Sequence, residues 1–118
     1  MSKNNQFPWL IRAFFHEWLV EQRNASIHTV RSYRDTWRLF LRFVAQRSGK
    51  KVAMITLADL TAGELIAFLG HAEHERGGTI GTRNCRLAAI RSFFNWRKMI
   101  KANTTTAITS SVIMAEYI

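Results

Sequence analysis

The sequence predicts an all-α fold, a four-helix bundle in one domain, and three observations support this prediction. Apolar residues recur every three or four positions through most of the 118 residues, which is the period of a helix. One proline and six glycines supply few of the turns that an all-β protein needs. The chain is 47% hydrophobic, with eight Phe and four Trp, which is enough for a single core.

Two helices are predicted in the first half of the chain. The first covers residues 7–23, where Pro8 suits a first helical turn. Its apolar residues at helical spacing are Leu10, Phe14, Trp18 and Leu19. The second runs from the N-cap Ser26 to about residue 47, and Ser48-Gly49 ends it. Its apolar side carries Val30, Tyr33, Trp37, Phe40, Leu41 and Val44.

Two more helices follow a connector with a short stretch at 52–57. Thr61 and Glu64 have the spacing of a capping box, which opens a helix that Gly77-Gly78 ends. Its apolar residues are Leu65, Ile66, Phe68 and Leu69. The last helix starts near 79–82 and runs to about 101; it is predicted to be central and largely buried through Leu87, Ile90, Phe93, Phe94, Trp96 and Ile100. Residues 103–118 have no clear period, so we expect a domain at 1–102 and a tail or linker after it.

Several kinds of site are not expected. Cys85 is the single cysteine and cannot form an internal disulfide, so we predict a small buried residue on the apolar side of the last helix. With no signal peptide and no membrane-spanning run, we expect a cytoplasmic protein. His71 and His74 lie one turn apart, but no second ligand pair accompanies them, so no metal is expected. The sequence predicts no cofactor, small-molecule substrate or catalytic residue.

The net charge of +9 favours a polyanionic partner, either nucleic acid or an acidic membrane surface. The charge is segregated. The second predicted helix carries five Lys and Arg against one acidic residue, and the last carries six against none. The third, counted with Asp59, carries one against four. A membrane-surface helix is disfavoured because Arg86 and Arg97 interrupt the apolar arc of the last helix, which core packing explains better.

The two basic helices contain candidate DNA contacts. On the second, Arg31, Arg34, Arg38 and Arg42 fall within about 80° at roughly 100° per residue and form a stripe suited to phosphates, with Ser32 nearer the bases. The last helix has a polar strip of Asn84, Ala88, Arg91, Ser92, Asn95 and Lys98. Asn and Arg suit bidentate contacts with adenine and guanine, and Arg83 and Arg86 near the helix start suit phosphates. Both surfaces also fit ordinary solvated helix faces.

Two motifs resemble those of the tyrosine recombinase core-binding domain, found in Xer-type recombinases and in phage and integron integrases. One is Ser26-x-x-Thr29-x-x-x-Tyr33-x-x-x-Trp37-x-x-Phe40-x-x-Phe43, and the other runs from Thr79 through Thr82, Asn84 and Arg86 to Phe94. The resemblance covers residues 7–101. It implies a SAM-like orthogonal bundle with Tyr33, Trp37, Leu87, Ile90 and Phe94 in the core. The DNA contacts that it implies are Thr29, Arg31, Ser32, Arg34, Thr82, Arg83, Arg86 and Arg91.

The resemblance implies a domain that binds double-stranded DNA sequence-specifically at a recombination half-site, with self-association on DNA. We expect this chain not to be an enzyme, because the catalytic domain that would supply the nucleophilic tyrosine is not in it. Tyr117 is not preceded by His-x-x-Arg. One alternative is a helical transcription regulator, which needs a turn of three to four residues before its recognition helix. Another is a protein-interaction module, whose binding would depend little on salt.

Overall fold

The computed structural model describes residues 5–103 and contains four α-helices. Their bounds are α1 Phe7–Ala13, α2 Ile27–Ser48, α3 Ala62–Arg76 and α4 Ile80–Asn103. The π-helix η1, Phe14–Gln22, continues α1, and the 3-10 turns η2, Val52–Met54, and η3, Leu57–Asp59, join α2 to α3. No strand occurs in residues 5–103, which confirms the all-α prediction. The predicted tail lies outside the described residues apart from Asn103, which belongs to α4.

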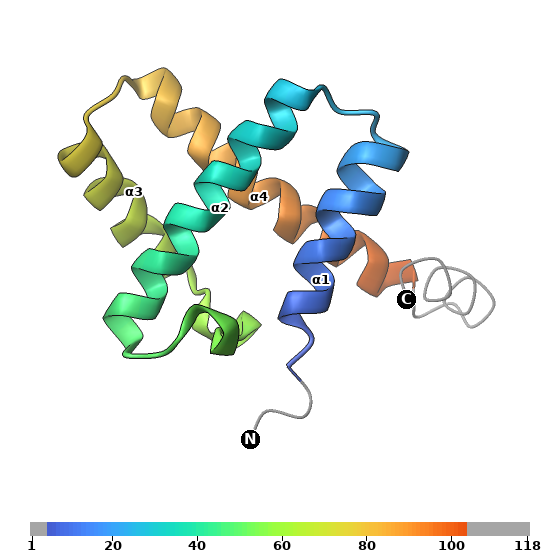
Figure 1. The fold of residues 1–118 in the computed structure, drawn as a ribbon, viewed down its shortest axis with the longest axis horizontal. Coiled ribbons are helices and arrows are strands. Elements are labelled where there is room, and N and C mark those ends of the chain that lie inside the picture. Colours follow the sequence, from blue (N-terminus) through green and yellow to red (C-terminus); the bar gives the residue numbers. More distant parts are fainter. Residues whose placement is uncertain (1–4, 104–118) are drawn as a thin grey trace.

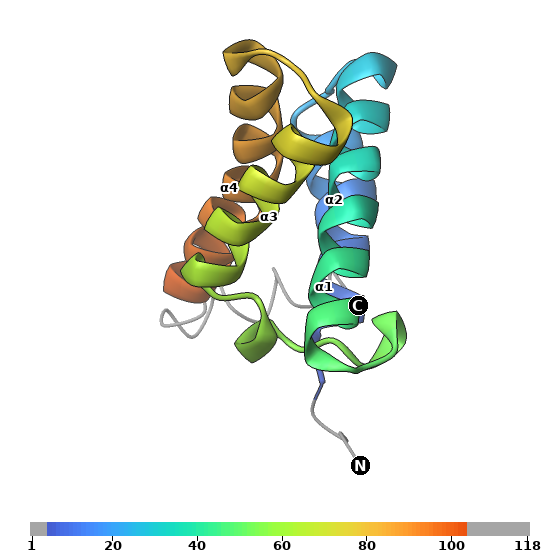
Figure 2. The same cartoon turned by 90° about the vertical axis from the view of Figure 1, so that its left-hand side faces the viewer.

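The helices form two hairpins that pack against each other. Figure 2 shows α3 and α4 on one side of the molecule, and α2 with α1 behind it on the other. In Figure 1, α2 crosses α4 near the middle of the molecule. Two contacts mark the crossing: Trp37 Nε1 donates to the carbonyl of Ala89 at 3.2 Å, and Ser92 Oγ lies 3.5 Å from Tyr33 Oη.

The first helix differs from the prediction because it is α-helical only as far as Ala13. Beyond it the turns widen, and the Arg23 backbone N–H donates to the carbonyl of Trp18, five residues back, at 2.7 Å. Leu10 and Phe14 are buried as predicted, and the next buried apolar residue is Leu19, five positions on. Trp18 is only half-buried, because a wider turn moves the inward position by one residue.

The core is built around Phe93 of α4. Its ring centroid lies 5.8 Å from that of Phe7, 5.6 Å from Phe14, 5.1 Å from Trp37 and 5.9 Å from Trp96. These rings come from α1, η1, α2 and α4, so one residue joins both hairpins. Of the core residues that the resemblance implied, Trp37 and Ile90 are buried, while Tyr33, Leu87 and Phe94 are half-buried against the core.

The prediction of a largely buried last helix was wrong for the first nine residues of α4. No side chain between Ile80 and Ala88 is buried, and Ile80 is 75% exposed. Cys85 is exposed as well, so its assignment to the core was wrong. The reason is tertiary: α2 crosses α4 at Ala89, and the turns before the crossing extend past the core.

The helix ends largely follow the sequence. The Ser26 side chain caps α2 by accepting the Thr29 N–H at 3.2 Å, and Gly49 and Gly77 adopt positive φ values of 70° and 69°. The Thr61 side chain caps α3 by accepting a hydrogen bond from the Glu64 backbone N–H. The Glu64 carboxylate does not return to the Thr61 backbone but pairs with Arg47 at 3.0 Å, so only half of the predicted capping box is formed. Ile66 was expected on the apolar side of α3 and is 68% exposed; Ala72 is buried there with Phe68 and Leu69.

Candidate nucleic-acid interface

The two basic helices begin at the same end of the molecule. Figures 1 and 2 both show the starts of α2 and α4 at the top, on either side of the crossing point. Ser26 caps α2, and Thr79 Oγ1 accepts the Thr82 N–H of α4 at 3.2 Å. The dipoles of both helices therefore place partial positive charge at this end, where it adds to the charge of the arginines.

The predicted contact residues are accessible. Thr29, Thr82 and Arg86 are half-buried, and the rest are exposed. The exposed residues are Arg31, Ser32, Arg34, Arg38, Arg42, Arg83, Asn84, Arg91, Asn95 and Lys98. None of these side chains is used to fill the core, so all of them remain available to a ligand.

The carboxylates of the described chain pair mostly with cations outside the predicted contact set. Glu64 pairs with Arg47 at 3.0 Å, and Asp59 pairs with Lys50 at 2.9 Å. One predicted contact, Arg83, lies 3.9 Å from Glu73, at the outer limit of an ion pair. Within residues 5–103 no ion pair involves Arg31, Arg34, Arg38, Arg42, Arg86 or Arg91. No ion pair within the described residues therefore neutralises these guanidinium groups.

The candidates on α2 do not all share one side of the helix. Thr29 and Arg38 are nine residues apart, which is about 180° around a helix of 3.6 residues per turn. The structure places Thr29 in a pocket with Asn95 of α4, whereas Arg38 and Arg42 line another pocket with Arg76 of α3. The candidates therefore form two groups, and Arg76 joins the second without having been predicted.

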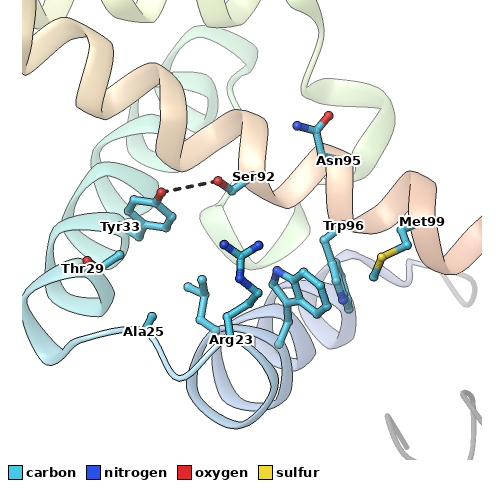
Figure 3. Close-up of a pocket in the computed structure, with 10 residues that line it drawn as sticks. Arg23, Ala25, Thr29, Tyr33, Ser92, Asn95, Trp96 and Met99 are labelled. Atoms are coloured by element: carbon cyan, nitrogen blue, oxygen red, sulfur yellow. Dashed lines mark hydrogen bonds between the residues drawn. The ribbon is translucent and has the colours of Figure 1, made fainter.

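The pocket that contains Thr29 has a volume of about 410 Å³. Figure 3 shows the Arg23 guanidinium pointing into it from below Tyr33 and Ser92. Arg23 also lies 5.7 Å from the centroid of the Trp18 ring, a cation–π contact. Sequence reasoning missed Arg23 because its approach to α4 depends on the chain reversal at Asn24, whose φ is 50°.

The histidine pair of α3 has a packing contact. The ring of His71 lies 5.1 Å from that of Phe43 on α2. Among residues 5–103, no group of three or more His, Cys, Asp or Glu side chains is arranged to hold a metal ion.

In the same part of the chain, no helix has the length and apolar character that a membrane crossing requires.

Comparisons with known proteins agree on one family. The profile described as phage integrase, N-terminal SAM-like domain, matches residues 11–101. Two integrase/recombinase proteins of Sinorhizobium fredii are 44% and 38% identical over 80% and 81% of this chain. The tyrosine recombinase XerC of Rhodospirillum centenum is 39% identical over 67% of it. The matches span 34%, 29% and 23% of these relatives. No solved structure matches the chain significantly.

Proposed function

The chain belongs to the family of phage integrase N-terminal SAM-like domains, and from this premise we propose that it binds duplex DNA sequence-specifically at a recombination half-site. It acts in the cytoplasm as the DNA-binding part of a tyrosine recombinase. Strand cleavage and rejoining belong to catalytic residues outside this domain. Copies of the domain bound to adjacent half-sites contact one another, so self-association depends on DNA.

The observation that carries this proposal is the projecting start of α4. Between Ile80 and Ala88 the helix buries no side chain, yet it carries Arg83 and Arg86. A helix about 10–12 Å across fits the major groove, which is about 12 Å wide. A segment that has no fully buried side chain, but has basic side chains and the positive end of a helix dipole, has the shape and charge for that groove.

The predicted contacts divide into two roles. Base edges are read by side chains with directional hydrogen bonds, and the phosphate backbone is held by the cations that flank them. The base-reading set is Thr29, Ser32, Thr82, Asn84, Arg91 and Asn95. The phosphate set is Arg31, Arg34, Arg38, Arg42, Arg83, Arg86 and Lys98.

The test is fluorescence anisotropy with short duplexes at several salt concentrations. A half-site taken from the ends of the mobile element is compared with a scrambled duplex. The wild type should bind the half-site more tightly and lose affinity steeply with salt. Arg91→Ala should lose about 1–3 kcal/mol of discrimination between the two duplexes.

Lys51→Ala is the matched control. Lys51 is exposed and belongs to the connection between α2 and η2. That connection lies at the end of the molecule opposite the starts of α2 and α4 (Figure 1). This variant loses the same charge but should keep its discrimination. Equal or undetectable binding of the wild type to both duplexes at low salt would overturn the proposal and favour a protein-interaction module.

One observation favours a helical transcription regulator as a second candidate. Only Gly77, Gly78 and Thr79 separate α3 from α4, which is the short turn that such a protein requires. In that case α4 alone would read the groove. Ser32→Ala would then leave the sequence preference unchanged, whereas the recombinase proposal requires this base-reading residue of α2 to contribute to it.

A further inference from the structure

The end of α3 lies beside the arginine stripe of α2. The helices pack antiparallel: Glu64 near the start of α3 pairs with Arg47 near the end of α2 at 3.0 Å, and Arg76 at the end of α3 lines a pocket with Arg38. Between these points, Phe68 lies 5.2 Å from Phe40 and His71 lies 5.1 Å from Phe43, measured between ring centroids. Continuing α3 by five residues from His71, about 7.5 Å at 1.5 Å per residue, reaches Arg76, its last residue. The antiparallel packing therefore brings the end of α3 beside Arg38 and Arg42 of α2.

Arg38, Arg42 and Arg76 line one pocket of about 250 Å³, together with Asp35 and Leu39. All three arginines are exposed, and none of them forms an ion pair with a carboxylate in residues 5–103. Three guanidinium groups on one concave surface repel one another unless an anion is shared between them. The geometry of the pocket therefore suits an anion.

Two carboxylates lie close to this cluster and reduce its charge. Asp35 lines the same pocket, and Glu75 lines a neighbouring pocket with Arg42 and Arg76. Neither carboxylate comes within ion-pair distance of the three arginines. The cluster keeps a net positive charge, and its guanidinium groups remain free to bind a ligand.

We propose that Arg76 joins Arg38 and Arg42 in a clamp for backbone phosphates at the far end of the α2 stripe; this inference rests on the proposed DNA binding. From Arg31 to Arg42 the stripe is about 16 Å long at 1.5 Å per residue. Measured along the duplex axis, where each strand has one phosphate per 3.4 Å, that length spans about five phosphates of one strand. Arg76 extends the contact from α2 onto α3, and its planar guanidinium binds phosphate bidentately.

The test measures the salt dependence of DNA binding for Arg76→Ala, Arg76→Lys and Asp35→Asn, with Lys51→Ala as the charge control. Arg76→Ala should weaken binding to the half-site and the scrambled duplex equally and reduce the slope of log K against log salt by about 0.9. Arg76→Lys should keep the slope but bind less tightly. Asp35→Asn should bind both duplexes more tightly, because it removes a like charge to the phosphates.

The outcomes separate this inference from the proposed function. If Arg76→Ala matches Lys51→Ala while Arg91→Ala loses discrimination, the clamp is wrong and the DNA-binding proposal stands. If the wild type binds no DNA, the proposed function fails. The clamp is then judged by NMR, following the Arg76 Nε–Hε signal during addition of inorganic phosphate; a signal that does not shift overturns it too.

Discussion

Trp37 of α2 donates its indole N–H to the backbone carbonyl of Ala89 on α4 at 3.2 Å, inside the core. The bond joins the two helices where they cross, so it also sets how far the start of α4 projects. Trp37 is 2% exposed and Ala89 is fully buried. A change at Trp37 therefore tests the crossing directly.

Trp37→Phe should lower the free energy of unfolding by about 1–3 kcal/mol, because it removes a buried hydrogen bond and leaves unfilled space. Urea unfolding followed by circular dichroism measures the change. The slope of free energy against urea should stay the same, since the fold is kept. An unchanged midpoint would show that the bond contributes nothing to the crossing.

Gly78→Ala should lower the free energy of unfolding by about 1–3 kcal/mol. Gly78 has φ of 120°, a backbone conformation that alanine rarely adopts, so alanine would strain the α3–α4 connection. Gly70→Ala is the control, because Gly70 lies within α3 with nothing within 4 Å of an added Cβ. It should raise stability by about 0.5–1 kcal/mol. A stabilising Gly78→Ala would contradict the positive φ.

Asp59→Asn should destabilise the fold by about 1 kcal/mol at neutral pH, as the loss of a capping carboxylate does. The backbone N–H of Thr56, and next the ammonium of Lys50, lower the pKa of Asp59 below 3.8. Asp59 therefore stabilises the fold above its ordinary pKa, and this contribution is lost as the pH falls through the lower folded value. Thermal unfolding from pH 7 downward should show the difference from wild type vanishing in acid. A difference that persists there would contradict this account.

Cys85 should react readily with Ellman's reagent in the native protein, since it is exposed near the start of α4. Saturating half-site DNA should slow the reaction at least several-fold by covering that surface. The control combines Cys85→Ser with Gly63→Cys, placing the thiol at an exposed site where an added Cβ meets only Thr61 Oγ1 at 3.8 Å. If DNA protects both thiols equally, the protection does not map to α4.

Most of the secondary structure was predictable because its signals are local. Ser26, Gly49 and Gly77 act on the residues beside them, so the bounds of α2 and the end of α3 could be inferred without the fold. The charge segregation is also local, since it follows from counting residues on each helix. The two motifs placed the chain in its family for the same reason.

The errors came from contacts between residues far apart in the sequence. Cys85 and Ile66 sit at positions that a helical period assigns to an apolar side, yet both are exposed. Burial needs a neighbouring helix, and no neighbouring helix covers these two side chains. Likewise the widened turns of η1, which bury Leu19 but leave Trp18 half-buried, do not follow from the α-helical period.

The sequence alone determined the all-α class, most of the helix ends, the basic second and fourth helices and the family. The tertiary structure decided that α2 crosses α4 at Ala89, leaving the first three turns of α4 projecting. It also brought Arg23 to the pocket of Thr29, and Arg76 to Arg38 and Arg42. Caps and periods depend on residues within a few positions of one another, whereas these placements depend on how side chains from separate helices fill one core.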